Sequence, residues 1–513
     1  MEIQELPVGE IIASIQDKLP ALFFVFSRGR TELLAQELGR QYDFLNKKEK
    51  KEVAQQVAKA EEAYLGTFSG PSWRVHKQLL MQGIAYHHAG LLPPVKYLVE
   101  KLYSQRLLWV VFCTETFAAG VNFPAASAVF DSTRKWDGRD FRILQNREFF
   151  QMAGRAGRRG FDRQGHAFIR VDGRFPEQTG FFKEKDVEPV EGRLVISPNT
   201  VLSLLRYKSD EEINRFLNEN FRMYQLKKKK HLLENEIKKI EETRDEIAKS
   251  LCPQSQTFSC PVQREKARRQ LKRLSWRGKD TEKEALKFKL AQAEPKHCNG
   301  KKKCRAILKK LSKIEGALNT LKQEHQVISL KEEGIFTEFS DVRRILEELG
   351  YVKGREFFPR GIFALEVHVQ EILVTEFAFA GILEDADPAE VAAVLAGVEF
   401  IPGKNVQAAK IDLPALREAA GIKRQLLKLG VPERFCIWSG MPGALAYAWY
   451  KGASFAELVQ MTTMQPGDIF SLFRREIDLL RQIERAAAAN PALAFRAAEM
   501  RKQIDRGEVA LCF

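Results

Sequence analysis

Two arginines three residues apart, Arg155 and Arg158, are the side chains in this sequence best suited to chemistry. They lie among small residues in the run QMAGRAGRRG at 151–160. If the stretch opens as a helix, both guanidinium groups leave from the same face. Their small neighbours let a large ligand approach, and a guanidinium offers a fixed fork of donors to the charge that develops during phosphoryl transfer. The alternative is a solvated basic turn.

Further polar groups follow apolar runs that are typical of buried strands. Ser27 and Arg28 follow the run 21–26, His88 follows 84–86, and Thr114 follows 108–113. Helical patterns separate most of these runs, which predicts a parallel, doubly wound α/β domain extending to residue 172. Ligands of such sheets bind beyond the carboxyl ends of the strands. Alone, each group is also compatible with an ordinary strand-to-helix turn.

The positive charge is concentrated in one segment. The chain of 513 residues has a net charge of +15. Residues 226–335 hold 22 lysines and 7 arginines against 15 acidic residues, a net charge of +14. Such a block usually meets a polyanion, most often nucleic acid. A solvated, self-repelling helical hairpin is the alternative. No apolar run is long enough to span a membrane, and no signal peptide is evident, so we expect a cytoplasmic protein without a membrane partner.

The rest of the chain is predicted to be helical. Residues 173–225 are a mixed link, and within 226–335 two stretches carry leucine and isoleucine at the spacing of a coiled-coil hairpin. Residues 336–513 form an α-helical C-terminal domain. The aromatic side chains Phe377, Phe379, Trp449 and Tyr450 are interpreted as core residues, with base stacking as the alternative.

Four of the seven cysteines lie in the basic segment. Cys252 and Cys260 are separated from Cys298 and Cys304 by 37 residues that read as two helices, about 262–275 and 282–294. An antiparallel hairpin would bring both pairs together at its base. Four thiolates suit a tetrahedral zinc ion or an iron–sulfur cluster. Reduced structural thiols and disulfides are the alternatives, because neither spacing is the usual C-x2-C.

Taken together, these motifs resemble a known family. FVFSR at 24–28, TETFAAGVNFPA at 114–125 and QMAGRAGRRG at 151–160 resemble motifs IV, V and VI of superfamily-two DExH-box RNA helicases, in the superkiller and exosome-helicase branch. The resemblance covers roughly 400 of the 513 residues, with the basic segment as the gap. It implies a second RecA-like domain at 1–172, a winged-helix-like link at 173–225, an arch insert at 226–335 and a ratchet-like helical domain at 336–513.

The resemblance implies ATP chemistry. In this family ATP with Mg²⁺ binds between two RecA-like domains, and the second domain supplies arginine fingers. Carried over by position, Arg155 and Arg158 would contact the γ-phosphate, and Gln151 would tie the motif into that network. The chain contains no G-x-x-x-x-G-K-[ST] phosphate loop and no D-E-x-H run. We therefore expect that the isolated chain neither binds ATP tightly nor hydrolyses it, and that activity needs a first RecA-like domain in cis or in trans.

The resemblance also implies contacts with RNA. Gly120 and Asn122 would couple the nucleotide to RNA. The implied contacts with the RNA backbone are Ser27, Arg28, His88 and Thr114. The implied function is the C-terminal half of an ATP-dependent helicase that unwinds RNA for processing or decay, with RNA-processing or decay enzymes as partners. A helicase remnant that binds RNA or a partner without catalysis is one alternative. Half of a DNA helicase is another.

Overall fold

The computed structural model describes residues 6–64, 67–68, 70–118, 124–138, 140–157, 162–172, 182, 186–252, 255, 257–276 and 280–511. Its contacts divide the chain into two compact units. Residues 1–190 and 345–513 form the first unit, and residues 191–344 form the second. The first and last predicted domains fall in the same compact unit, so this division does not test the predicted boundaries at 172, 225 and 335.

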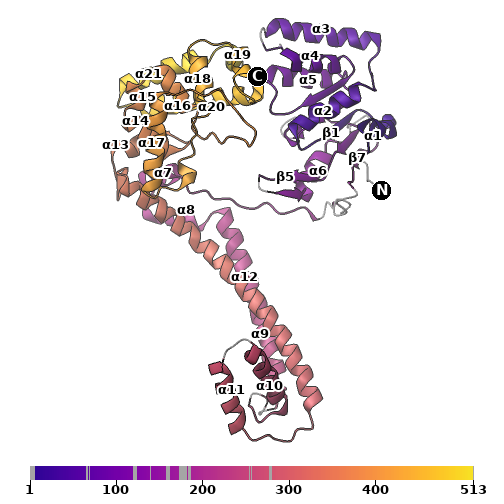
Figure 1. Ribbon diagram of the computed structural model, residues 1–513, viewed down its shortest axis with the longest axis vertical. Helices are drawn as coiled ribbons and strands as arrows, with labels where there is room; N and C mark the ends of the chain where they lie inside the picture. Colours follow the sequence, from indigo (N-terminus) through magenta and orange to yellow (C-terminus); the bar gives the residue numbers. More distant parts are fainter. Residues whose placement is uncertain are drawn as a thin grey trace. The chain divides into compact units, whose positions relative to one another are not determined.

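A five-stranded parallel sheet forms the centre of the first part of the chain (Figure 1). Its order is β2–β3–β1–β4–β7, and all neighbouring strands in it are parallel. The strands are β1 Ala21–Phe24, β2 Ile84–His87, β3 Val110–Cys113, β4 Ser127–Phe130 and β7 His166–Ile169. Strands β1, β2 and β3 arise from the apolar runs that begin at residues 21, 84 and 108, and β1 to β4 are buried throughout. The predicted α/β architecture is therefore confirmed.

Helices alternate with these strands. They are α1 Val8–Ser14, α2 Arg28–Gly39, α3 Lys47–Ala63, α4 Gly70–Leu80, α5 Pro93–Ser104 and α6 Asn146–Ala153. Local sequence explains several starts. The side chain of Asn46 caps α3 in a reciprocal arrangement with Glu49, and Pro93 occupies the first turn of α5. A short antiparallel hairpin, β5 Arg134–Trp136 with β6 Phe141–Ile143, precedes α6 and was not predicted.

The second unit consists of helices among its described residues. They are α7 Pro198–Tyr207, α8 Asp210–Asn218, α9 Phe221–Lys249, α10 Pro261–Trp276, α11 Asp280–Gln292 and α12 Lys301–Glu348, whose last residues belong to the first unit. Between residues 186 and 225 the described part of the chain has no strand, so a winged-helix-like link stays a prediction.

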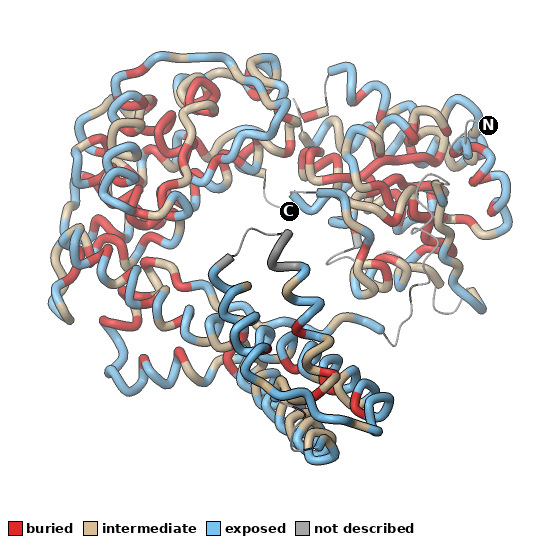
Figure 2. Tube along the Cα trace, turned by 60° about the horizontal axis from the view of Figure 1, so that its bottom comes forward, coloured by how far each residue is buried: buried red, intermediate tan, exposed pale blue. Residues whose placement is uncertain are grey.

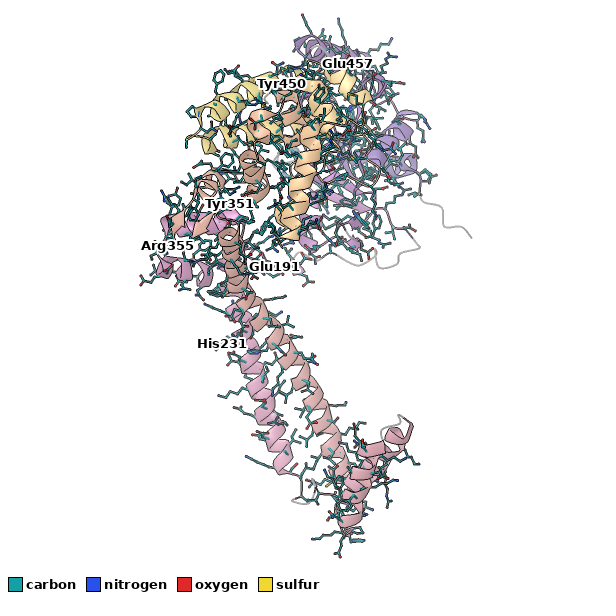
Figure 3. All side chains as sticks on the ribbon, turned by 60° about the vertical axis from the view of Figure 1, so that its left-hand side comes forward. Glu191, His231, Tyr351, Arg355, Tyr450 and Glu457 are labelled. Atoms are coloured by element: carbon teal, nitrogen blue, oxygen red, sulfur yellow. The ribbon has the colours of Figure 1, made fainter. Side chains whose placement is uncertain are left out.

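Helices α9 and α12 pair in opposite directions. Lys230 Nζ lies 2.7 Å from Glu332 Oε2, and Lys322 Nζ lies 2.6 Å from Glu241 Oε1. Earlier positions on α9 thus meet later positions on α12, as an antiparallel hairpin requires. Side chains project along the whole pair, among them His231 on α9 (Figure 3). The pair is far more exposed than the sheet (Figure 2), which fits its charged composition.

The C-terminal part is a compact set of helices after a small hairpin, β8 Val352–Lys353 with β9 Glu356–Phe357. The helices are α13 Pro359–Glu366, α14 Glu371–Phe379, α15 Ile382–Asp385, α16 Pro388–Leu395, α17 Pro414–Lys428, α18 Gly443–Tyr450, α19 Phe455–Gln460, α20 Pro466–Ala486 and α21 Pro491–Ile504. Trp449 is fully buried, and its ring stacks on Phe473 at 5.5 Å. Phe377 is also fully buried, whereas Phe379 is half-exposed, so the core interpretation is confirmed for Trp449 and Phe377.

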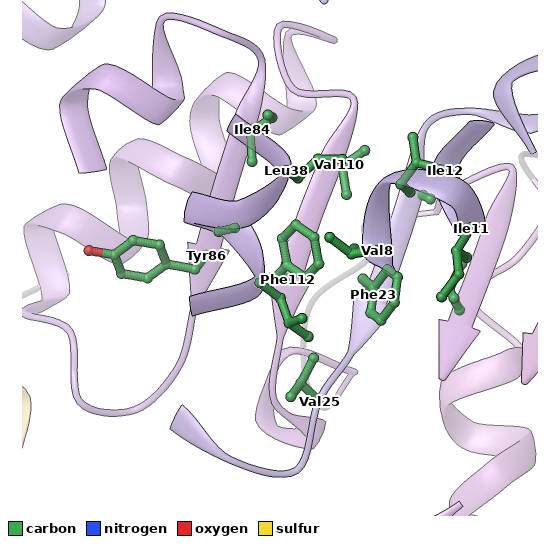
Figure 4. Packing of buried hydrophobic residues seen from close by; sticks show 14 of the residues in the cluster. Val8, Ile11, Ile12, Phe23, Val25, Leu38, Ile84, Tyr86, Val110 and Phe112 are labelled. Carbon is green, nitrogen blue, oxygen red and sulfur yellow. The ribbon is translucent and has the colours of Figure 1, made fainter. Parts of the chain in front are cut away.

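One apolar cluster lies between the sheet and helices α1 and α2 (Figure 4). Val8 and Ile12 of α1 belong to the same cluster as Phe23 of β1, whose ring lies 4.9 Å from that of Phe112 on β3. Burying each large apolar side chain contributes roughly 1.5–3 kcal/mol. The cluster therefore gives the sheet a rigid base for the polar groups at its strand ends.

Candidate functional site

The predicted polar groups gather at one edge of the sheet. Phe24 pairs in register with Cys113 on one side and with Phe130 on the other, and His87 also pairs with Cys113. The strands are parallel, so the residues that follow them emerge at the same edge. The predicted groups brought there are Ser27, Arg28, His88 and Thr114, and Asp131, which was not predicted as a site residue, lies at the same edge after β4.

Gln151 lies exposed on α6, and Arg155 follows the end of that helix at Ala153. Because the helix stops before Arg155, the condition for a shared helical face with Arg158 is not met. The backbone N of Ala125 donates to Arg155 O at 2.9 Å, and Gly157 N donates to Ala125 O at 2.8 Å. The arginine turn is therefore paired with the end of motif V. Arg158, Gly120 and Asn122 lie outside the described residues.

A carboxylate that the sequence argument missed anchors α6. Glu148 Oε1 and Oε2 accept hydrogen bonds of 2.8 Å each from Arg142, and Lys135 Nζ lies 2.8 Å from Oε1. The side chain also accepts from Gln145 N at 2.9 Å in a capping box. Burial alone would raise the pKa of Glu148, but the hydrogen bonds from Arg142 and Lys135 outweigh it and lower the pKa to about 2. The signal in the sequence was the glutamate three residues after the cap.

The groups of motif IV are engaged by the protein itself. The Ser27 hydroxyl caps α2 and accepts from Arg30 N at 3.5 Å. Arg28 Nη1 donates to Asp468 Oδ2 at 2.7 Å and to Gln465 Oε1 at 3.2 Å, both on the C-terminal helical part. An RNA phosphate at Arg28 would therefore meet a guanidinium that is already paired on one side.

A second ion-pair centre lies beside motif IV. Asp131, which follows β4, is nearly buried and pairs with Arg30 at 2.5 Å and with Arg170 at 2.7 Å. Arg30 belongs to α2 and Arg170 follows β7, so one carboxylate joins three elements of this edge. This arrangement, too, was missed in the sequence.

His88 lies inside the domain. Its side chain is 1% exposed, Nε2 lies 3.1 Å from Glu32 Oε1, and Nδ1 accepts from Gly90 N at 3.2 Å. As placed, the ring has almost no surface for RNA. His76 stacks on Tyr86, which stacks on His88. Burial lowers the pKa of His76 to about 3, with smaller contributions from His88 and His87.

Thr114 follows β3 and is half-buried. Its Oγ1 lies 2.8 Å from Oγ1 of Thr116, so a hydroxyl pair stands at the strand end. Of the four predicted RNA contacts, Ser27, Arg28 and Thr114 keep some exposed surface.

The four cysteines of the second unit are brought near one another. Cys260 and Cys304 are buried in one small cluster, while Cys252 and Cys298 lie outside helices. Burial raises the pKa of Cys304, and the thiols of the other three cysteines raise it further. Among the described residues no group of three or more histidine, cysteine or acidic side chains is arranged to hold a metal ion. The expectation of zinc or an iron–sulfur cluster is therefore not supported in this arrangement.

Basic side chains are exposed at several places on the second unit. Lys227, Lys228 and Lys229 lie near the start of α9, and 301–303 open α12. Arg268 and Arg269 are exposed on α10. No helix among the described residues is long and apolar enough to cross a membrane.

Comparisons with known proteins agree with these motifs. Residues 356–511 match the DSHCT (NUC185) domain. The chain is similar to superkiller complex protein 2 of Homo sapiens, with 38% identity over 38% of this chain and 16% of the relative. It is similar to the DExH-box ATP-dependent RNA helicase DExH10 of Arabidopsis thaliana, with 36% identity over 46% of this chain and 24% of the relative. Exosome RNA helicase MTR4 of Homo sapiens is 36% identical over 40% of this chain and 20% of the relative.

The matches thus span less than a quarter of each of these relatives. The chain combines a five-stranded parallel sheet with a helical C-terminal part that matches the DSHCT domain. The chain is therefore similar to the superkiller and exosome-helicase branch of the DExH-box RNA helicases, and the matches support a C-terminal region of that family.

Proposed function

We propose that this chain is the C-terminal half of an ATP-dependent RNA helicase that moves along RNA and unwinds it for processing or decay. The observation that carries the proposal is the anchored arginine turn after α6. Glu148 ties α6 to Arg142 and Lys135, and Ala125 pairs with Arg155 through the backbone. A rigid turn of this kind suits an arginine that stabilises charge on a transferring phosphoryl group without first reorganising.

ATP chemistry in this proposal needs a first RecA-like domain. The chain has no phosphate loop and no DExH run, so its own residues supply neither a phosphate cradle nor carboxylates for Mg²⁺. Phosphoryl transfer depends on positioning and charge neutralisation, and half of that machinery does not suffice. We therefore expect no measurable ATP turnover by the pure chain.

The decisive experiment supplies a first RecA-like domain of the family, fused or in trans, and measures RNA-stimulated ATP hydrolysis. Replacing Arg155 and Arg158 by alanine should lower kcat by about 10³-fold, as for other arginine fingers. The control is Arg417→Ala, which removes an exposed arginine paired with Asp412 far from the motifs in sequence. Undiminished hydrolysis by the double variant would end the proposal.

A second candidate is an RNA- or partner-binding module without catalysis, and half of a DNA helicase is a further alternative. The exposed lysines 227–229 and 301–303 favour binding, because neutralising phosphates releases counterions. Changing Lys301, Lys302 and Lys303 to glutamine should weaken RNA binding and flatten its dependence on salt. Equal affinity for RNA and DNA strands of matched sequence would show that binding does not discriminate RNA from DNA, which would favour the alternatives to an RNA helicase.

RNA-processing or decay enzymes are the proposed partners. The names of two similar proteins, a superkiller complex protein and an exosome RNA helicase, support this choice. The experiment is co-purification of the tagged chain with its cellular partners after nuclease treatment. Recovery of no ribonuclease subunit would count against it.

A separate part of the proposal is that the four cysteines bind one zinc ion. Cys260 and Cys304 are held by packing, and the backbone N of Lys296 donates to Ser259 O at 3.1 Å, which joins the two segments. Cys252 and Cys298 would have to move toward them as their protons leave, because zinc binds thiolates at about 2.3 Å. Metal analysis of the purified chain, with Cys436→Ser as the control, should give one zinc that Cys304→Ser loses. An iron–sulfur cluster would show instead as visible absorption.

A further inference from the structure

The start of α20 lies against the loop that follows β2. Gly467 N donates to Gly90 O at 2.8 Å. A Cβ atom added at Gly90 would lie 1.7 Å from Gln465 Oε1, and one added at Gly467 would lie 2.4 Å from Ala89 O. At position 467 only glycine leaves room for this approach, because the atoms it faces belong to the backbone. The C-terminal helical part thus touches the strand-end edge backbone to backbone.

Two side chains at the start of α20 hold the arginine of motif IV. Arg28 Nη1 donates to both oxygens of Asp468, at 2.9 and 2.7 Å, and to Gln465 Oε1 at 3.2 Å. Asp468 lies in the first turn of α20. All three hydrogen bonds use the same nitrogen, so they orient the guanidinium group without consuming it.

The opposite edge of this guanidinium remains open. Among the described residues, Nε and Nη2 of Arg28 have no hydrogen-bond partner, and the side chain is 41% exposed. Nε and Nη2 present parallel N–H groups, which is the geometry that grips two oxygens of a phosphate. A half-exposed ion pair contributes little to stability. Orientation of the arginine is therefore its more important physical effect.

The same glutamine also reaches the histidine of the edge. Gln465 Nε2 donates to Glu32 Oε1 at 3.4 Å, and that oxygen lies 3.1 Å from His88 Nε2. One amide thus joins the groups that follow β1 and β2. The buried His88 can therefore help to hold Glu32 and Gln465 in place without touching a ligand itself.

We infer that Asp468 and Gln465 are positioning residues for an RNA phosphate held by Arg28, so that the C-terminal helical part completes a backbone-binding site of the RecA-like sheet. This inference rests on the proposed function in RNA binding. Asp468 fixes one side of the guanidinium, and the edge formed by Nε and Nη2 receives the phosphate. The site is therefore shared between residues 440 positions apart in sequence.

The test uses the sign of the effect of Asp468→Ala. Removing a negative charge should by itself strengthen binding of a polyanion. Loss of a positioning residue should weaken it instead, by about tenfold if one oriented charge-assisted contact is lost. The measurement is fluorescence anisotropy of a labelled single-stranded oligouridylate with the full chain, over a range of salt concentrations.

Three further variants complete the experiment. Asp412→Ala is the matched control, since it removes the same charge from an exposed pair with Arg417 and should leave binding equal or slightly tighter. Asp468→Glu should restore most of the affinity. Arg28→Ala should weaken binding and lower the salt slope by about one phosphate, and Asp468→Ala should add little to it.

The outcomes separate the two proposals. Tighter binding by Asp468→Ala than by Asp412→Ala would mean that Asp468 competes with RNA, which overturns the inference but keeps the RNA function. Unchanged binding by both Asp468→Ala and Arg28→Ala would remove Arg28 from the RNA site. Absence of RNA binding by the wild-type chain would overturn the proposed function together with the inference. Thermal unfolding of each variant identifies any loss caused by misfolding.

Discussion

The ion pairs of Glu148 allow a quantitative prediction for Glu148→Gln. A pKa that falls from 4.5 to about 2 on folding corresponds to about 3 kcal/mol of stabilisation. The Glu148 side chain is 19% exposed and that of Arg142 is 33% exposed, so solvent screening reduces this figure. We expect the variant, which keeps the shape but loses the charge, to be about 2 kcal/mol less stable at pH 7.

The shifted pKa of Glu148 also predicts how the stability difference between wild type and Glu148→Gln changes with pH. The folded-state pKa lies below the unfolded value, so the carboxylate's contribution is fully present above about pH 4.5. It is lost as the pH falls through the folded-state value near 2, because the folded form is then protonated too. The difference between wild type and Glu148→Gln should therefore be constant near neutrality and shrink below pH 4.5.

Urea unfolding followed by circular dichroism, at several pH values between 7 and 3, measures this difference. Glu457→Gln is the control, because Glu457 occupies the same capping-box position in α19 but, among the described residues, its carboxylate accepts hydrogen bonds from Ser454 and pairs with no cation. Equal urea midpoints for wild type and Glu148→Gln at pH 7 would refute the reasoning. A difference that stayed constant down to pH 3 would refute its electrostatic origin.

Three other predictions concern packing, titration and thiol chemistry. Gly467→Ala should destabilise the chain by about 2 kcal/mol in thermal unfolding, because its Cβ would meet Ala89 O and Leu91 O, whereas Gly421→Ala, which meets nothing within 4 Å inside α17, should be neutral or stabilising. Stability should fall as the pH drops from 6.5 toward 3, because unfolded His76 binds a proton in that range and folded His76 does not, and His76→Phe should reduce this slope in urea unfolding. Among free thiols, exposed Cys252 should react with an aromatic disulfide reagent faster than buried Cys304, whose pKa is raised, and mass spectrometry of the labelled peptides measures the order.

The sheet was predictable because several of its strands come from nearly continuous apolar runs. The runs 21–26 and 108–113 contain almost only apolar residues, and both became strands buried on two faces. The β5–β6 hairpin was not predictable. Each strand has three residues, and its aromatic side chains Trp136 and Phe141 are 44% and 57% exposed. No burial pattern marks such a hairpin, whose pairing is instead accompanied by ion pairs such as Arg142 with Glu148.

For the site, the sequence predicted the types of the residues and the edge of the sheet at which they lie. Parallel strands carry the groups that follow them to one side, so local sequence indicated where Arg28, His88 and Thr114 would meet. Local sequence did not indicate that His88 would be buried against Glu32. Burial of a strand-end side chain depends on what covers the edge, and the start of α20 is more than 370 positions further along the chain.

The pairing of Arg28 with Asp468 shows why motif and partner must be considered together. An arginine at a strand end is interpreted from its neighbours as a ligand group, and the half-exposed side chain of Arg28, bonded through Nη1, agrees with that interpretation. The direction of the guanidinium, however, is determined by an aspartate 440 positions away. A change in the C-terminal helical part would therefore alter the strand-end edge of the sheet while leaving the sequence runs 24–28, 114–125 and 151–160 intact. It follows that loss of RNA affinity in a variant of α20 need not place α20 itself on the RNA.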